Sequence, residues 1–325
     1  MTRAVRVHAY GGPEVLKVED IIVGAPGPGE VKLRQTAIGL NYIDVYLRTG
    51  LYPQSVMPFI PGQEGAGVVI ETGKGVAELK IGDRVAYAGP SGGYAEERLI
   101  AADRLVPLPP GIDDKTGAAM MLQGMTVEYL LNRTFKVGPD TVLLLHAAAG
   151  GIGLIACQWA RALGATMIGT VSSPEKAALA KAHGCTHVIN SKTENFVERV
   201  REITGGKLCD VVYDSVGKDT FPASLDCLKP RGLFVSFGQS SGPVPPFNVG
   251  ILNQKGSLYL TRPSMTGYMS KREELLASAA ALFAMVGGGK IKIEVNQTYP
   301  LSRAADAHRD LEGRKTTGST VLLPG

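Results

Sequence analysis

The segment 141–165, TVLLLHAAAGGIGLIACQWARALGA, restricts the possible fold more than any other part of the chain. A continuous apolar run is followed by a turn of small residues and then by apolar residues at helical spacing. This order predicts a strand, a tight turn and a helix. Because the apolar run does not alternate with polar residues, we expect the strand to be buried on both faces, as in a parallel sheet covered by helices.

Strand and helix patterns continue to alternate after this segment, which predicts an α/β fold with a doubly wound parallel sheet. The expected strands are 166–171, 187–190, 210–214 and 232–237, and the expected helices begin at Pro174 or cover 194–204 and 220–228. A last strand is expected in 257–263, SLYLTRP, at the edge of the sheet.

The small residues of the turn are typical of dinucleotide binding. Ala148, Gly150 and Gly153 occupy its three small positions, with alanine in place of the first glycine. Small side chains let a pyrophosphate approach the backbone N–H groups at the positive end of the helix. The alternative is a simple tight turn, but the surrounding strands and helices favour a dinucleotide site. His146, just before the turn, is expected to be a packing residue rather than a catalyst.

The end of the second strand indicates which dinucleotide is bound. NAD-binding units usually carry Asp or Glu there, whereas this chain has Ser172 and Ser173, followed by Lys176. Two hydroxyl groups and a cation suit the 2′-phosphate of NADPH. Both serines could instead cap the helix that begins at Pro174, and the two roles are compatible. Glu175 is expected to point away from this site.

The remaining sequence has a different pattern. Residues 1–123 are rich in Gly and Pro with short alternating runs, which predicts a mostly β domain of small barrel type. The tail, 264–325, contains a helix at Arg272–Met285 and later strands such as STVLL. We therefore expect a nucleotide-binding domain, 124–263, inserted into a first domain that the tail completes.

Composition and charge exclude several classes of protein. Lys and Arg outnumber Asp and Glu by 34 to 30, and the basic residues are dispersed, so nucleic-acid binding is not expected. The longest near-apolar stretch, Leu275–Val286, is too short to cross a bilayer, and the first ten residues lack the apolar core of a signal peptide. These features predict a cytoplasmic protein without a membrane partner.

The cysteines and histidines do not form a metal-binding pattern. The chain has four widely spaced cysteines, which fits reduced, buried thiols better than disulfides or a zinc site. His183 and His187 have helical spacing, but Gly184 between them is expected to end the helix. No metal site is predicted.

Several motifs, taken together, identify a family. The segments GEVKLRQTAIGLNYIDVYLRTGLYP, FIPGQEGAGVVIETG, GDRVAY, HAAAGGIGLIACQWARALGA and YDSVG resemble the medium-chain dehydrogenase/reductase superfamily. More narrowly, the whole chain resembles the zinc-independent quinone oxidoreductases of the zeta-crystallin type. The resemblance implies a Rossmann domain inserted into a GroES-like barrel domain, and NADPH as the cofactor.

The resemblance also implies where the chemistry takes place. Zinc alcohol dehydrogenases of the superfamily carry Cys where this chain has Asn41 and His where it has Gln63, so both zinc ligands are replaced by amides. Without a metal, these amides could donate hydrogen bonds toward the substrate. Tyr46 and Tyr52 are the expected phenolic donors near the substrate oxygen, although both could instead be wall residues. Asp44 and Glu64 could orient these groups or be structural.

By position, the resemblance places two sets of residues at the cofactor. Thr126 and Tyr129 are implied near the nicotinamide half. The other implied cofactor residues are Gly150, Gly151, Ile152 and Gly153 at the pyrophosphate, Ser173 and Lys176 at the 2′-phosphate, Phe237, Gly238 and Ser240 at a strand end, and Arg314 in the loop GRKTTG.

The expected function is metal-free, NADPH-dependent reduction of a small-molecule quinone. A quinone is a strong electron acceptor, so modest hydrogen-bond donors suffice to assist hydride transfer from nicotinamide C4. The alternatives are an alkenal or enoyl reductase, and a nucleotide-binding protein with an RNA-binding or structural role. The edge strand in 257–263 lacks an inward charge or a central proline, so we expect it to pair with a second copy in a homodimer.

Overall fold

The computed structural model describes residues 1–325, and the chain divides into two compact units. The first unit comprises residues 1–125, 269–287 and 293–325, and the second comprises 126–268 and 288–292. Helix α2 (Asp114–Tyr129) begins in the first unit and ends in the second. None of the helices combines the length and the apolarity that a membrane-spanning segment needs.

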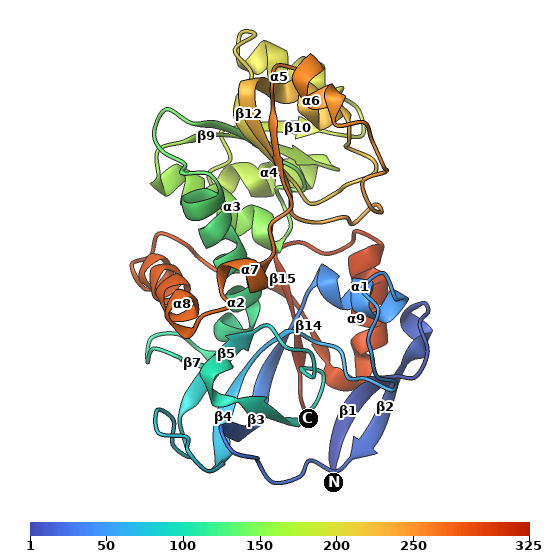
Figure 1. Cartoon of the computed structure of the whole chain (residues 1–325), viewed down its shortest axis with the longest axis vertical. Coiled ribbons are helices and arrows are strands. Elements are labelled where there is room, and N and C mark those ends of the chain that lie inside the picture. The colour runs from blue at the N-terminus through green and yellow to red at the C-terminus, as the bar shows by residue number, and fades with distance from the viewer. The chain divides into compact units, whose positions relative to one another are not determined.

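A six-stranded parallel sheet forms the centre of the second unit (Figure 1). Its strand order is β10-β9-β8-β11-β12-β13, so the chain moves outward from β8 in one direction and then in the other. This topology confirms the predicted doubly wound sheet. The strands are β8 (Val142–Leu145), β9 (Thr166–Val171), β10 (His187–Asn190), β11 (Cys209–Asp214), β12 (Leu228–Ser236) and β13 (Tyr259–Thr261).

The helices of this unit connect the strands, as expected, with one exception. The predicted helix 220–228 is wrong: only a short 3₁₀ helix, η4 (Ala223–Cys227), forms after Pro222, because Leu228 already begins strand β12. The remaining helical elements are the π-helix η3 (Leu130–Thr134), α3 (Gly151–Ala162), α4 (Pro174–Ala182), α5 (Phe196–Ile203), α6 (Gly250–Gln254) and α7 (Met265–Tyr268).

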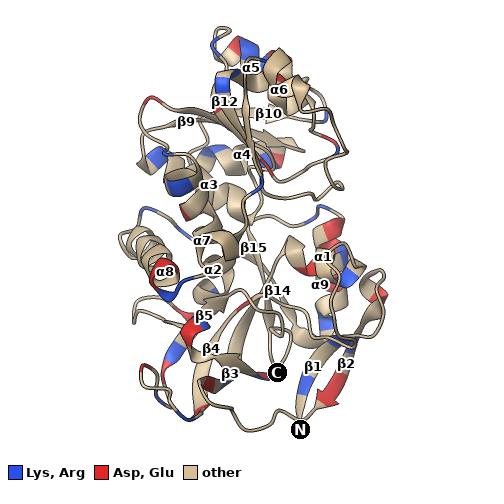
Figure 2. Ribbon diagram, in the orientation of Figure 1, with Lys and Arg blue, Asp and Glu red and all other residues tan.

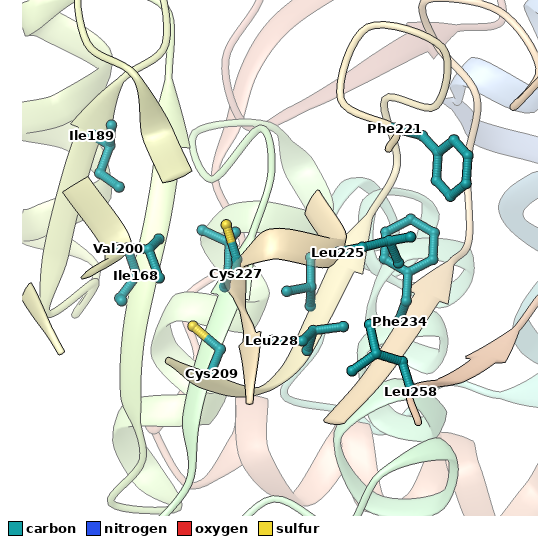
Figure 3. Packing of buried hydrophobic residues seen from close by; sticks show 12 residues of the cluster. Ile168, Ile189, Val200, Cys209, Phe221, Leu225, Cys227, Leu228, Phe234 and Leu258 are labelled. Carbon is teal, nitrogen blue, oxygen red and sulfur yellow. The ribbon is translucent and has the colours of Figure 1, made fainter. Parts of the chain in front are cut away.

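The core of the second unit is apolar and includes two of the cysteines. Cys209 and Cys227 lie among aliphatic and phenyl side chains on one side of the sheet (Figure 3). All four cysteines are buried and free, and burial is the largest of the effects that raise the pKa of Cys227 to about 12. These thiols therefore contribute to packing, as small apolar side chains do.

The first unit is built on a seven-stranded sheet and a two-stranded ribbon. The sheet has the order β14-β15-β3-β4-β5-β7, with β6 paired to β3, and the ribbon is formed by β1 and β2. Strand β15 pairs antiparallel with β3, so the C-terminal segment completes the N-terminal domain. The strands are β1 (Thr2–Val7), β2 (Leu16–Ile21), β3 (Glu30–Leu40), β4 (Glu64–Thr72), β5 (Arg84–Ala88), β6 (Glu97–Ala101), β7 (Val106–Pro107), β14 (Val295–Pro300) and β15 (Ser319–Leu323).

Two helices of the first unit matter for the site. Helix α1 (Tyr42–Thr49) starts at a capping box, in which the Asn41 backbone N–H donates to the Asp44 carboxylate. Helix α9 (Ala304–Glu312) precedes the loop that carries Arg314. The other helical elements are η1 (Pro13–Val15), η2 (Ala102–Arg104), α8 (Arg272–Gly287) and η5 (Leu301–Arg303).

Figure 2 shows Lys and Arg interspersed with Asp and Glu along the chain.

Candidate active site

The turn between β8 and α3 has the geometry of a phosphate-binding turn. Gly150 is the N-cap of α3, and its N–H donates to the carbonyl oxygen of Ala147 at 3.0 Å. A Cβ on Gly153 would collide with the carbonyl group of Ala148 and lie 2.6 Å from the Ala147 oxygen. The first N–H groups of the helix have no partner within the helix. Gly150, Gly151, Ile152 and Gly153 thus lie at a helix end whose positive potential suits an anion, and their contact with a pyrophosphate stays a prediction.

The predicted 2′-phosphate residues lie at the end of the next strand, β9. Ser173 is the N-cap of α4, and its hydroxyl oxygen accepts from the Lys176 backbone N–H at 3.3 Å. Ser173 therefore has the capping role that was predicted as compatible with phosphate binding. A hydrogen bond from the Ser173 side chain lowers the pKa of the Glu175 carboxyl group. Glu175 therefore faces Ser173 and does not point away from it as expected. A negative charge therefore lies beside Ser173.

Two further sets of predicted cofactor residues also lie in the second unit. Phe237 and Gly238 follow β12, and both backbone N–H groups donate to the Asp214 carbonyl, at 2.8 and 3.3 Å. Ser240 donates its N–H to the Ser215 carbonyl at 3.1 Å, so this segment is held against the end of β11. Thr126 and Tyr129 are both buried on α2.

Tyr129 packs against another tyrosine. Its ring stacks on that of Tyr268 with centroids 4.6 Å apart and an interplanar angle of 10°. Burial raises the pKa of Tyr129 to about 12, so its hydroxyl remains a hydrogen-bond donor at neutral pH.

The predicted catalytic residues lie in the first unit. Asn41 is buried, its side-chain N–H donates to Glu64 at 2.6 Å, and its side-chain oxygen accepts from Gln123 at 3.0 Å. Gln63 is half-buried, and its side-chain nitrogen lies 3.4 Å from the Ser91 hydroxyl. Asn41 is thus held within a polar network rather than left free, which restricts the donor role predicted for it.

Three tyrosines form an aromatic cluster on and after α1. The ring of Tyr46 lies 5.5 Å from that of Tyr42 and 5.3 Å from that of Tyr52, the latter in an edge-to-face arrangement. The structure therefore brings Tyr46 and Tyr52 together, and their role as hydrogen-bond donors to a substrate stays a prediction. Tyr42 extends the cluster, and the sequence analysis had not included it.

Two buried carboxyl groups share Asn41 as a donor. Asp44 accepts from its backbone N–H at 2.9 Å, and Glu64 accepts from its side chain and, at 2.8 Å, from the Leu122 N–H. Burial raises the pKa of Asp44 to about 7 and that of Glu64 to about 8, more than these hydrogen bonds lower them. Burial therefore favours the protonated form of both carboxyl groups.

A chain of buried donors leads from Arg48 to Asp44. Arginine only donates, so the Nδ1 atom of His308, 3.1 Å from the Arg48 guanidinium, must accept. Burial lowers the pKa of His308 to about 3, so the neutral ring carries its proton on Nε2 and donates to Tyr94 at 3.0 Å. The Tyr94 hydroxyl then donates to Asp44 at 3.2 Å.

The start of this hydrogen-bond network is an ion pair between buried Arg48 and Glu312, whose side chain is 31% exposed. Both terminal nitrogens of Arg48 donate to Glu312, each at 2.8 Å, which joins α1 to α9. Sequence reasoning missed Tyr94, His308 and Glu312. Their partners lie 50 to 264 residues away, and no local pattern connects them.

The comparisons with known proteins agree with this architecture. Residues 27–110 match the alcohol dehydrogenase GroES-like domain, and residues 151–285 match the zinc-binding dehydrogenase family. A quinone oxidoreductase of Pseudomonas aeruginosa is 55% identical over 325 residues, which is 100% of both chains. The chain belongs to the quinone oxidoreductase family of the medium-chain dehydrogenase/reductase superfamily.

A solved structure and a further relative also match over nearly the full chain. The crystal structure of an Escherichia coli quinone oxidoreductase complexed with NADPH has a TM-score of 0.98 at 50% identity, and covers 99% of this chain and 100% of its own. A 2-haloacrylate reductase from a Burkholderia species is 48% identical over 331 residues, 100% of this chain and 99% of that protein.

The residues at the zinc positions of the superfamily do not fit a zinc ion. Asn41 uses a side-chain N–H and its side-chain oxygen in hydrogen bonds to Glu64 and Gln123. The amide of Gln63 is a poor ligand compared with thiolate or imidazole. No group of three or more His, Cys, Asp or Glu residues is placed to hold a metal ion.

The buried carboxyl groups predict an unusual pH dependence of stability. Below about pH 4.5 Glu64 is protonated in both states, whereas between about pH 4.5 and 8 the folded protein retains a proton that the unfolded chain has lost. The free energy of unfolding should therefore fall as the pH rises through this range, and Glu64→Gln should reduce this fall. Urea unfolding at several pH values measures the slope.

The control for this experiment lies on the same strand. Glu71→Gln removes a carboxyl group of β4 that is 44% exposed and paired with Lys32, and it should keep the slope of the unmodified protein. An unchanged slope in Glu64→Gln would contradict the assignment.

Proposed function

We propose that the protein is an NADPH-dependent quinone oxidoreductase. The observation that carries this proposal is the match to the Escherichia coli quinone oxidoreductase complexed with NADPH, at a TM-score of 0.98 and 50% identity. The quinone oxidoreductase of Pseudomonas aeruginosa, 55% identical over its full length, supports the same activity. The cofactor supplies a hydride from nicotinamide C4, and one proton from solvent completes the conversion of quinone to hydroquinone.

The second unit is proposed to bind the cofactor. The N-terminus of α3 attracts the pyrophosphate, and the hydroxyl of Ser173 with the ammonium group of Lys176 recognises the 2′-phosphate. Thr126, Tyr129, Phe237, Gly238 and Ser240 complete the proposed set in this unit, and Arg314 is proposed from the first unit. We propose residues 124–263, the range predicted from the sequence, as the cofactor-binding domain.

The first unit is proposed to bind the quinone. The hydroxyl groups of Tyr46 and Tyr52 donate hydrogen bonds to the oxygen on which negative charge develops. Asn41 and Gln63 supply the polar wall, and Glu64 orients Asn41. A reduced quinone oxygen is a stabilised phenolate, so these neutral donors suffice and no metal is required.

A specific observation also favours a second candidate, reduction of a conjugated carbon–carbon double bond. The Burkholderia relative, 48% identical over 100% of this chain, is a 2-haloacrylate reductase. Alkenals and enoyl compounds use the same hydride donor, but the hydride then forms a stable C–H bond.

An anaerobic assay with 1,4-benzoquinone tests the proposed activity. We expect one NADPH to be oxidised for each hydroquinone formed, with the same turnover after prolonged chelation of metals. Absence of hydroquinone would refute the activity, and loss of turnover on chelation, reversed by zinc, would refute the proposed independence from metals.

Replacing Lys176 tests the selection of NADPH over NADH. A charge-assisted hydrogen bond contributes about 1.5 to 3 kcal/mol, so Lys176→Ala should weaken NADPH binding about tenfold or more. NADH lacks the 2′-phosphate, so its affinity should change little. The matched variant Glu175→Gln removes the adjacent negative charge and should strengthen NADPH binding. Calorimetric titration measures both, and equal losses for NADPH and NADH would contradict the assignment.

We further propose a cytoplasmic homodimer that forms through strand β13. This strand is at the edge of its sheet, and Tyr259 and Leu260 are 62% and 37% exposed. An exposed edge can pair with its symmetry mate across a twofold axis. Sedimentation at micromolar concentration should give the dimer mass, and Leu260→Pro should give a folded monomer. A monomer mass for the unmodified protein would refute the dimer.

A further inference from the structure

A buried polar chain crosses the carboxyl ends of three neighbouring strands in the second unit. It contains His146 after β8, Thr170 of β9, Asp214 at the end of β11 and Ser224 of η4. All four residues are at least nine-tenths buried. The strand order β9-β8-β11 makes these strand ends neighbours. Buried polar side chains are costly unless their hydrogen bonds are satisfied, so the direction of each bond can be followed.

The last residue of this hydrogen-bond network is Asp214, whose carboxylate only accepts hydrogen bonds. Asp214 receives the backbone N–H groups of Val216 and Gly217 at 2.8 and 2.9 Å and the Thr220 hydroxyl at 2.6 Å. The Ser224 hydroxyl lies 3.2 Å from the same carboxylate. The Thr220 carbonyl, at 3.1 Å, is the other acceptor within reach of this hydroxyl, and a carboxylate is the stronger acceptor of the two. Ser224 therefore donates to Asp214.

This direction determines the remaining bonds. The Ser224 oxygen, 2.9 Å from Nε2 of His146, must accept, so Nε2 carries the hydrogen. Nδ1 of the neutral ring then accepts from the Thr170 hydroxyl at 3.1 Å. The Thr170 oxygen in turn accepts the backbone N–H of Ala147 at 3.4 Å. Every donor in this hydrogen-bond network, from the Ala147 N–H onward, therefore points toward Asp214.

The other end of the hydrogen-bond network is Ala147, the strained residue of the proposed phosphate-binding turn. Ala147 has a φ of +60°, a conformation that residues other than glycine rarely adopt. Such a residue persists only where its surroundings hold it. Thr170 binds this turn twice, because its carbonyl oxygen also accepts the Ala148 N–H at 2.9 Å. The Ala147 carbonyl then accepts from Gly150, the N-cap of α3.

We propose that the chain Asp214–Ser224–His146–Thr170 is a positioning network for the cofactor pyrophosphate. It holds Ala147 in its left-handed conformation and thereby aims the N–H groups at the start of α3. The proposal rests on the proposed binding of NADPH at this turn. Thr170 and His146 are positioning residues, because they act through the backbone of the turn.

The test compares two substitutions of Thr170 and three ligands. Thr170→Val keeps the shape of the side chain but removes the hydroxyl, whereas Thr170→Ser keeps the hydroxyl. NADPH and NADH contain the pyrophosphate, and 2′-AMP contains only the adenosine with its 2′-phosphate. Calorimetric titration gives the dissociation constant of each ligand.

We expect Thr170→Val to weaken NADPH and NADH by the same factor, about fivefold, which corresponds to one ordinary hydrogen bond. The affinity for 2′-AMP should stay unchanged, and Thr170→Ser should bind all three as the unmodified protein does. In steady-state kinetics, KM for NADPH should rise, while kcat and KM for the quinone stay constant. A purely structural role would lower the melting temperature without this pattern.

Two outcomes would overturn the inference: unchanged NADPH affinity in folded Thr170→Val, or an equal loss for 2′-AMP. If Thr170→Val does not fold, Ser224→Ala provides the test. It interrupts the hydrogen-bond network far from the turn and should change the affinities for the three ligands in the same way. Failure of the proposed function is recognised separately, because the unmodified protein would then not bind NADPH.

Discussion

Replacing Glu312 by glutamine is expected to lower the free energy of unfolding by about 3 kcal/mol, because it leaves a buried charge without its partner. The Arg48 side chain is only 1% exposed, and both of its terminal nitrogens donate to the Glu312 carboxylate at 2.8 Å. Glutamine has nearly the same shape but offers one neutral oxygen. Urea unfolding followed by circular dichroism measures the loss.

An exposed ion pair on the same helix provides the control. Asp306 pairs with Arg303 and Arg309, whose side chains are 62% and 52% exposed. Asp306 and Glu312 are similarly exposed, at 38% and 31%, so the two ion pairs differ chiefly in the burial of the arginine. Solvent screens the charges of a surface pair, so Asp306→Asn should cost much less than Glu312→Gln. Equal effects of the two substitutions would show that the pair joining α1 to α9 does not stabilise the first unit.

Replacing Gly153 by valine is expected to weaken NADPH binding at least hundredfold. Its Cβ would collide with the backbone of Ala147 and Ala148, which cannot move without opening the turn. Loss of two charge-assisted hydrogen bonds from the helix end to the pyrophosphate would cost about 3 kcal/mol or more, which is a factor of a hundred or more. Calorimetric titration with NADPH measures the change.

The control for this substitution is Gly138→Val. Gly138 lies in the loop before β8, where an added Cβ would meet no atom within 4 Å. This variant should bind NADPH as the unmodified protein does. A folded Gly153→Val protein with unchanged affinity would contradict the assignment of the turn.

The sequence predicted the second unit well because its signal is local. Continuous apolar runs identified the strands, with β9 predicted at its observed bounds, Thr166–Val171. The predicted helix 220–228 failed because the interval between Pro222 and strand β12 is too short for more than a 3₁₀ turn. A side-chain bond also stabilises this turn, since the Thr220 hydroxyl donates to Asp214 at 2.6 Å.

The candidate site could be predicted only in part. Spacing and resemblance found Asn41, Gln63 and the turn before α3. The partners of these residues come from distant segments: Glu64 is 23 residues from Asn41, and Gln123 is 82 residues away. Only folding brings such groups together, so the sequence could not indicate that Asn41 is held on both sides. The hydrogen-bond network that leads from Arg48 through His308 and Tyr94 to Asp44 was missed for the same reason.

A comparison of acceptors tests the central claim most directly. NADPH oxidation is followed with 1,4-naphthoquinone, a 2-alkenal and 2-chloroacrylate under identical conditions, and kcat/KM is determined for each. We predict that the quinone has a kcat/KM at least about tenfold higher than either alkene, which corresponds to about 1.4 kcal/mol of additional transition-state stabilisation. A higher kcat/KM for the alkenal or for 2-chloroacrylate would contradict the assignment as a quinone oxidoreductase.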